Sequence, residues 1–157
     1  MAVTIDVATY EDIPAVLASA DALVATDAGQ YDAGATDLDW AAKTGLAYCT
    51  ALLASADNLV LLARREDIVG HLVARLSGPS SVHPIRIAEL ESIHVYADHR
   101  GQGIGDQLVT AFLAWAKAKG AHRVSVTAYA ANEGAQRFYA RHGFTPRSVI
   151  LDRDLRR

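Results

Sequence analysis

The sequence predicts an α/β fold in which a mixed, mostly antiparallel sheet carries helices on both of its faces. The chain has 157 residues, of which 51% are hydrophobic, and this is enough for one core that needs no disulfide. Strand-like and helix-like segments are interleaved, and three strand-like segments follow one another through short connections. No repeat, linker or low-complexity tract interrupts the chain, so residues 1–157 are expected to form a single domain.

Helical periodicity predicts four helices. Thr9 or Asp12 is expected to cap the first, which holds Pro14 in its first turn and ends before a loop over residues 27–37. The other three helices are expected over residues 39–54, 104–119 and 132–142. Asp39 is the expected N-cap of the second helix. Apolar alternation or short apolar runs predict six strands, over residues 3–7, 59–63, 68–76, 85–96, 124–128 and 148–151.

Composition excludes several classes of protein. The single cysteine, Cys49, rules out an intramolecular disulfide, and its helical spacing with Leu46 and Leu53 predicts a buried small hydrophobic residue. The six histidines show no metal-ligand spacing, so no metal site is expected. There is no basic run with interleaved aromatic residues, no long apolar span and no targeting pattern. We therefore expect no nucleic-acid partner, no membrane partner and a cytoplasmic location.

Charge is distributed unevenly along the chain. The formal net charge is only −3, but no Lys or Arg precedes Lys43, whereas eight acidic residues do. An acidic N-terminal part would attract a cationic partner through its summed field, and a basic C-terminal part suits an anionic cofactor. Solvated surface charge explains the same asymmetry without either partner, and both interpretations stay open.

A glycine-rich turn stands between the strand over residues 85–96 and the helix over residues 104–119. Its residues are Arg100-Gly101-Gln102-Gly103-Ile104-Gly105. Glycines let bare backbone N–H groups approach an anion beside the positive end of the helix dipole, so this turn predicts a phosphate site. A Rossmann pattern requires a third glycine where Asp106 stands, and a Walker pattern requires Lys-Ser/Thr after the last glycine, so neither fits.

The same run resembles the pyrophosphate loop of the GNAT family of acetyl-coenzyme A (acetyl-CoA) dependent N-acetyltransferases, which has the pattern Arg/Gln-x-x-Gly-x-Gly/Ala. The resemblance extends back through 90–95, which is similar to the family's fourth strand, and forward through 132–144, which is similar to its second cofactor motif. It covers roughly residues 85–146. It implies the GNAT fold of the acyl-CoA N-acyltransferases, acetyl-CoA as cofactor with CoA as product, and acetyl transfer to an amine.

The resemblance also implies which residues bind the cofactor. The loop residues expected at the pyrophosphate are Arg100, Gly101, Gln102, Gly103, Ile104, Gly105 and Asp106. The backbone of Ile93, His94 and Val95 is expected to face the pantetheine arm and the thioester carbonyl. Asn132 is expected to contact the same arm, to cap its own helix, or to do both.

Acetyl transfer to an amine requires a base, because an aliphatic amine is mostly ammonium at neutral pH. On a regular strand Glu89 and Glu91 share an apolar face with Ile93, while His94 lies on the opposite face. Glu91 matches the base position of polyamine-type family members and is favoured. Glu89 matches that of histone-acetylating members, and a third possibility is that both are merely exposed or ion-paired. Tyr139 matches the family tyrosine near the cofactor sulfur, which implies an acid for the leaving thiolate.

The acceptor is expected to be a primary amine of a cationic small molecule, polyamine-like or aminoglycoside-like, because the N-terminal part of this family borders the acceptor cleft and is acidic here. Two alternatives stay open. One is acetylation of protein N-termini or lysines, and the other is a CoA-binding sensor module without turnover. Dimers are common in the family, so a homodimer is a candidate assembly.

Overall fold

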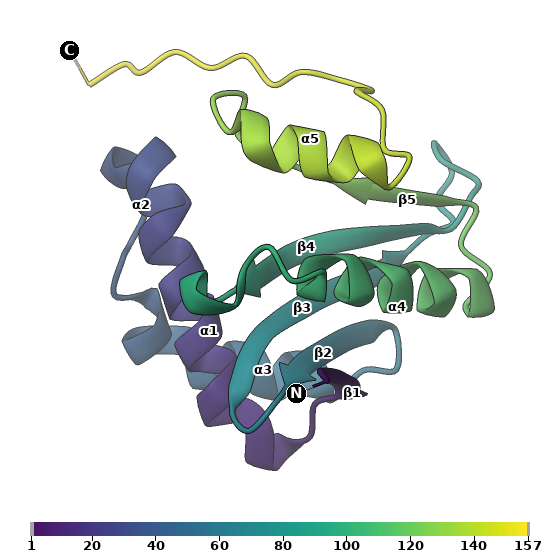
Figure 1. Ribbon diagram of the computed structural model, residues 1–157. Coiled ribbons are helices and arrows are strands. Elements are labelled where there is room, and N and C mark those ends of the chain that lie inside the picture. Colours follow the sequence, from purple (N-terminus) through teal and green to yellow (C-terminus); the bar gives the residue numbers. More distant parts are fainter. Residues whose placement is uncertain (1, 157) are drawn as a thin grey trace. The chain divides into compact units, whose positions relative to one another are not determined.

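The computed structural model describes residues 2–156 (Figure 1). The chain divides into two compact units, residues 1–127 and 128–157. The described strands and helices α1 to α4 belong to the first unit, and α5 belongs to the second. The single domain over residues 1–157 stays a prediction.

The first unit is built on a five-stranded sheet. Its strands are β1 (Thr4–Val7), β2 (Asn58–Arg64), β3 (Ile68–Ser77), β4 (Ile87–Val95) and β5 (Arg123–Val126), in that spatial order. Neighbouring strands pair antiparallel except β4 and β5, which pair parallel. The mixed, mostly antiparallel sheet is therefore confirmed, and the short connections between β2, β3 and β4 are what allow antiparallel pairing.

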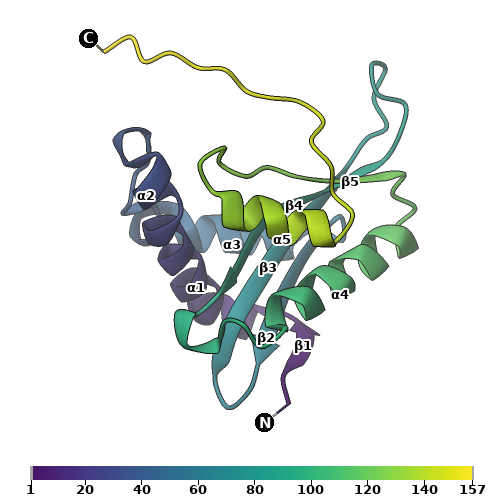
Figure 2. The ribbon, with the colours of Figure 1, turned by 45° about the horizontal axis from the view of Figure 1, so that its top comes forward.

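Helices cover both faces of this sheet. Helices α1 (Ile13–Thr26) and α3 (Leu46–Leu53) contact one face, and α4 (Ile104–Ala118) contacts the other (Figures 1 and 2). The core under α1 and α3 consists of Ala8, Ile13, Val16, Cys49, Leu52, Val60, Leu62 and Val73. Side chains alternate between the two faces of a strand. The buried residues of β2 and β3 that alternate with Val60, Leu62 and Val73 therefore face α4, whose Leu108 and Phe112 are fully buried. The buried position predicted for Cys49 is confirmed.

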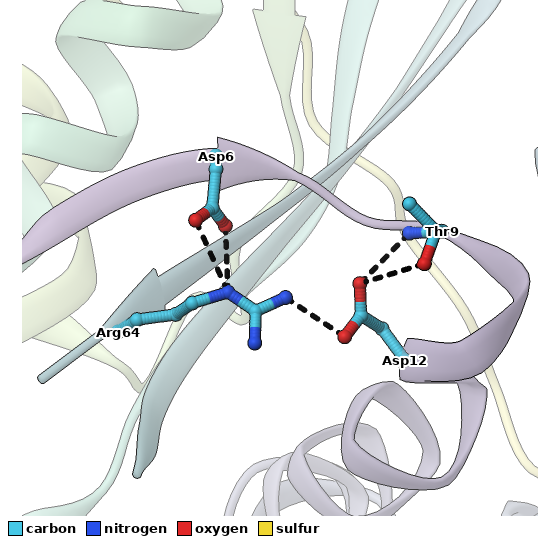
Figure 3. Close-up of polar contacts among 4 residues, drawn as sticks. All are labelled: Asp6, Thr9, Asp12 and Arg64. Carbon is cyan, nitrogen blue, oxygen red and sulfur yellow. Dashed lines mark hydrogen bonds and ion pairs between the residues drawn. The ribbon is translucent and has the colours of Figure 1, made fainter. Parts of the chain in front are cut away.

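An ion-pair cluster ties the start of α1 to the edge of the sheet. Arg64 at the end of β2 donates to Asp6 on β1 at 2.8 Å and to Asp12, the residue before α1, also at 2.8 Å (Figure 3). The carboxylate of Asp12 also accepts a hydrogen bond from the backbone N–H of Thr9 at 2.8 Å. Hydrogen bonding from Arg64 is the main cause that lowers the pKa of Asp12. Two of the eight N-terminal acidic residues are thus neutralised within the fold.

The segment before α3 differs from its prediction. Residues 27–37 are not a plain loop, since they contain α2 (Ala28–Tyr31) and a 3-10 turn at Ala33–Ala35. The helix expected from Asp39 begins instead with a π-helical turn, Ala41–Gly45, whose N-cap is Trp40. Asp37 accepts the backbone N–H of Asp39 at 2.9 Å and pairs with Lys43, but no side chain caps this helix, so the N-cap predicted at Asp39 is wrong.

The second unit contains one helix, α5 (Glu133–Arg141). The side chain of Asn132 accepts the backbone N–H of Ala135 at 3.1 Å, so the predicted N-cap is confirmed. The strand predicted over residues 148–151 is wrong, because these residues are extended without a strand partner in the described chain, and Val149, Ile150 and Leu151 are exposed. An apolar run becomes a strand only where a neighbouring backbone accepts its hydrogen bonds, and sequence alone does not supply that neighbour.

Gly70 of β3 marks a close approach between two strands. A Cβ built on it would lie 2.5 Å from the carbonyl oxygen of His94 on β4, which is backbone and cannot move aside cheaply. Gly70→Ala is therefore expected to lower the free energy of unfolding by about 1–3 kcal/mol, measured by urea denaturation. The matched control is Gly134→Ala in α5, where the nearest atoms are at 3.8 Å and a gain of up to about 1 kcal/mol is expected. Equal stability of Gly70→Ala and the wild type would contradict the close approach.

Candidate active site

A β-bulge in β4 lies at the predicted base and changes the direction of the residues that follow it. Val73 of β3 pairs with Ser92 and the next residue, Ala74, pairs with Leu90, so Glu91 is the extra residue. The bulge reverses the alternation of the strand after this point. His94 therefore pairs with His71 and lies on the α1 side of the sheet with Glu91. The expectations that Ile93 shares a face with Glu91 and that His94 lies opposite are both wrong, because they assumed a regular strand.

Glu91 has polar neighbours in place of the apolar ones expected. Its Oε2 accepts a hydrogen bond from the hydroxyl of Tyr48 in α3 at 2.7 Å and one from Nε of Arg75 on β3 at 3.2 Å. Its side chain is 31% exposed, so it is partly open to solvent or to a ligand. Burial is the main cause that raises the pKa of Tyr48 and the bond to Glu91 adds to it, so this hydroxyl stays protonated and continues to donate.

Glu89, the alternative base, lies in a different setting. It is exposed and pairs in register with Arg75 of β3 and Ser125 of β5. It does not line the pocket that adjoins Glu91. Neither carboxylate lines the pocket itself, but Glu91 accepts a hydrogen bond from Tyr48 of the pocket wall, whereas Glu89 is exposed. The choice of Glu91 as the base stays a prediction.

The pocket lies between α1 and the sheet and has a volume of about 270 Å³. Its lining residues are Val16, Ala20, Leu23, Val24, Trp40, Tyr48, Val73 and Ser92. Tyr48 belongs both to this wall and to the hydrogen bond with Glu91, and Ser92 follows Glu91 in the chain. The carboxylate thus lies beside one end of a small, mainly apolar pocket.

A chain of buried hydrogen bonds leads from this pocket into the interior. His71 Nε2 lies 3.2 Å from the Ser92 hydroxyl, and His71 Nδ1 lies 2.5 Å from the hydroxyl of Ser19 on α1. Ser19 is also 3.0 Å from His94 Nδ1. Burial lowers the pKa of His71 to about 3, with a contribution from nearby His94, and burial also lowers the pKa of His94 to about 4. Both imidazoles are therefore neutral. No sequence pattern links these four side chains, because they come from distant parts of the chain.

The sheet opens between β4 and β5 at the level of Glu91. β5 pairs with β4 only from Ile87 to Leu90, and in the described chain no strand pairs with residues 91–95 on that side. The carbonyl of Val95 accepts Nε of Arg100 at 2.8 Å. The backbone of residues 93–95 therefore has no strand partner on the β5 side in the described chain, which leaves this edge free for the predicted contact with the pantetheine arm. The contact itself stays a prediction.

The glycine-rich turn has the backbone conformation expected of a phosphate loop. Gly101 and Gly103 have φ of 74° and 77°, and a Cβ at either would meet nothing within 4 Å, so the loop surface is open. Gly103 is the N-cap of α4 and has no side chain to satisfy the first backbone N–H groups of the helix, at Ile104 and Gly105. These groups suit an anion such as a pyrophosphate.

Arg65 is a loop contact that the sequence analysis did not identify. From the turn between β2 and β3 it donates through Nη1 to the side-chain oxygen of Gln102 at 2.8 Å, and it lies 3.3 Å from Nδ1 of His99. The side chain of Gln102 is thus used to hold the loop. Pairing between residues 37 positions apart has no local sequence signal, which is why it was missed.

The second unit contains the two remaining predicted site residues. Asn132 caps α5, and Tyr139 lies within that helix with its ring in edge contact with Phe138 and Phe144, at centroid distances of 5.4 and 5.8 Å. The roles of Asn132 and Tyr139 toward a cofactor stay predictions.

Among residues 2–156, no group of three or more His, Cys, Asp or Glu side chains is arranged to hold a metal ion. None of the described helices is both long enough and apolar enough to cross a membrane.

Comparison with known proteins gives a family and several structural neighbours. The acetyltransferase (GNAT) family model matches residues 26–144. An uncharacterized N-acetyltransferase, MJ1207, of Methanocaldococcus jannaschii is 33% identical over 82 residues, which are 52% of this chain and 36% of that relative. The crystal structure of a transcriptional regulator from Bacillus halodurans C-125 is 25% identical, with a TM-score of 0.77, over 98% of this chain and 100% of that chain.

A third neighbour is AAC(6′)-Iy in complex with a bisubstrate analogue, CoA-S-monomethyl-acetylneamine. It is 20% identical, with a TM-score of 0.75, over 98% of this chain and 99% of that chain, and this likeness shows the fold. The family match covers the glycine-rich turn, the bulged strand β4 and well over half of the chain, so the chain belongs to the acetyltransferase (GNAT) family.

Proposed function

We propose that the protein is an N-acetyltransferase that moves acetyl from acetyl-CoA directly to the primary amine of a small molecule. The observation that carries the proposal is the position of Glu91. Glu91 is the extra residue of the bulge in β4 and hydrogen-bonds Tyr48 of the pocket wall, at the level where β5 no longer pairs with β4. A base beside a substrate pocket and next to an unpaired strand edge is the arrangement that amine acetylation requires.

The chain's own residues fit acetyl-CoA. The open turn at Gly101 and Gly103 and the first N–H groups of α4 can hold the pyrophosphate, and Arg65 holds that turn in place through Gln102. Acetyl-CoA supplies the activated acetyl thioester. Backbone N–H groups of residues 93–95 would orient the thioester carbonyl, and Glu91 accepts a proton from the ammonium so that the free amine can attack that carbonyl. Tyr139 is the proposed acid for the leaving thiolate, on the strength of the motif it shares with the family.

Direct transfer requires no covalent intermediate on the protein. Cys49, which is the one cysteine of the chain, is buried, and burial raises the pKa of its thiol, so it does not offer a thiolate for acetyl relay. Amines that are cationic at neutral pH, including polyamine-like and aminoglycoside-like amines, are the proposed acceptor class. The test is acetyl-CoA turnover by the full chain with a panel of amines, read as release of free thiol. Absence of turnover together with tight CoA binding would favour the sensor alternative and contradict the proposal.

The glycine turn offers a direct test of cofactor binding. Gly103→Val places a β-branched residue at a φ of 77°, which distorts the turn, and is expected to weaken CoA binding at least tenfold by calorimetry. Gly120→Val is the matched control, because Gly120 has a φ of 76° at the other end of α4 and equally open surroundings. The control should lose comparable stability and keep its CoA affinity. Equal loss of affinity in both variants would contradict a cofactor site at the turn.

A further inference from the structure

The pocket beside Glu91 is apolar and uncharged, although the N-terminal segment that contributes to its wall is acidic. Aliphatic side chains of α1 and β3 form most of its wall, and none of its lining residues is charged. Of the N-terminal acidic residues, Asp6 and Asp12 pair with Arg64 and Asp37 pairs with Lys43. Glu91 is the carboxylate that adjoins the pocket, because it accepts a hydrogen bond from the hydroxyl of Tyr48, which is part of the pocket wall.

The polar groups on the pocket wall are neutral. The Ser92 hydroxyl is bonded to His71, which is fully buried and neutral, and a hydroxyl with one such partner can still make a further hydrogen bond. The indole N–H of Trp40 is buried and has no hydrogen-bond partner in the described chain.

These observations favour an acceptor that has one cationic end and an uncharged body. A pocket of about 270 Å³ lies below the roughly 300–1,000 Å³ typical of sites for drug-sized ligands. A second ammonium placed among the aliphatic residues of α1 would be buried without a counter-ion, which costs several kcal/mol. A chain of amines or an amino sugar with several ammonium groups therefore fits this pocket poorly.

We infer that the acceptor is a monoamine carried on an apolar, aromatic or branched alkyl body, with the amino group at Glu91 and the body between α1 and the sheet. This inference rests on the proposed function and narrows its substrate class. A neutral oxygen on the body matches the hydroxyl of Ser92. The polyamine-like and aminoglycoside-like amines are then the poorer members of the proposed acceptor class.

The first experiment compares four amines with the wild-type full chain. Turnover with acetyl-CoA is measured as thiol release for 2-phenylethylamine, tyramine, spermidine and kanamycin. We expect kcat/KM for the better aromatic amine to exceed that for spermidine and for kanamycin by at least tenfold. A preference for either polyamine or aminoglycoside would overturn the inference and leave the proposed function standing. No turnover with any amine, together with no CoA binding, would remove the proposed function and this inference with it.

The second experiment fills the pocket. Ala20→Phe adds a ring to the α1 wall, whereas Ala25→Phe adds the same ring at an exposed position of the same helix. Ala20→Phe is expected to lower kcat/KM for the preferred amine at least tenfold while the affinity for CoA is unchanged, and Ala25→Phe should leave both as they are. Undiminished turnover by folded Ala20→Phe would overturn the inference. Should Ala20→Phe not fold, Ala20→Leu replaces it under the same criterion.

Discussion

Glu91→Gln is expected to lower kcat by about a hundredfold or more with the preferred amine, which is the loss typical when a general base is removed. The glutamine side chain has almost the same size and can still accept from the hydroxyl of Tyr48, so the pocket wall should remain in place. The amide cannot take the proton of the ammonium. Initial rates of thiol release at saturating acetyl-CoA give kcat, and calorimetry should show an unchanged affinity for CoA.

Glu89→Gln is the control for this experiment. Glu89 is exposed on the same strand, so the variant removes one carboxylate charge from β4 without changing the pocket. Its kcat is expected to stay within about twofold of the wild type. A large loss in Glu89→Gln and none in Glu91→Gln would assign the base to Glu89. Equal small effects would leave Glu91 as a partner of Arg75 without a catalytic role.

The sequence predicted those elements whose signals are local. The glycines of the turn, the apolar stripe of α4 and the cap at Asn132 each depend on residues within a few positions, and all three lie where they were expected. The hairpin of β2 and β3 was predicted from two apolar runs separated by a charged turn. In these places local preference and tertiary packing favour the same structure.

The sequence did not predict features that depend on pairing across the fold. The bulge at Glu91 exists only in the register between β4 and β3, so a single strand pattern cannot show it. Its consequence is large, because it brings His94 to the α1 side and leaves Glu91 with Tyr48 and Arg75 as neighbours. The same limit explains why the network of His71 was missed.

Acidification is expected to destabilise the protein through that buried network. The pKa of His71 is lowered to about 3 and that of His94 to about 4, both mainly by burial, whereas an unfolded histidine titrates near 6.5. Below about pH 6.5 the unfolded chain therefore binds protons that the folded chain does not, and the free energy of unfolding falls as pH falls. The stabilisation that comes from the two neutral histidines is complete above about pH 6.5. It is lost progressively as the pH falls from there to the pKa values of the folded protein. Each histidine adds a slope of up to about 1.4 kcal/mol per pH unit.

Urea denaturation between pH 7 and 5 measures this slope, because most carboxyl groups stay ionised over that range. Between pH 7 and 5 the free energy of unfolding of the wild type should fall by more than the titration of one histidine can explain. His71→Gln is expected to reduce the slope by about half, since it removes one of the two depressed histidines and keeps groups that can bond Ser19 or Ser92. His83→Gln replaces an exposed histidine in the loop before β4 and should leave the slope unchanged. A wild-type stability that is flat from pH 7 to 5 would show that the two imidazoles take up protons in the folded protein, which is incompatible with a neutral hydrogen-bonded chain behind the pocket.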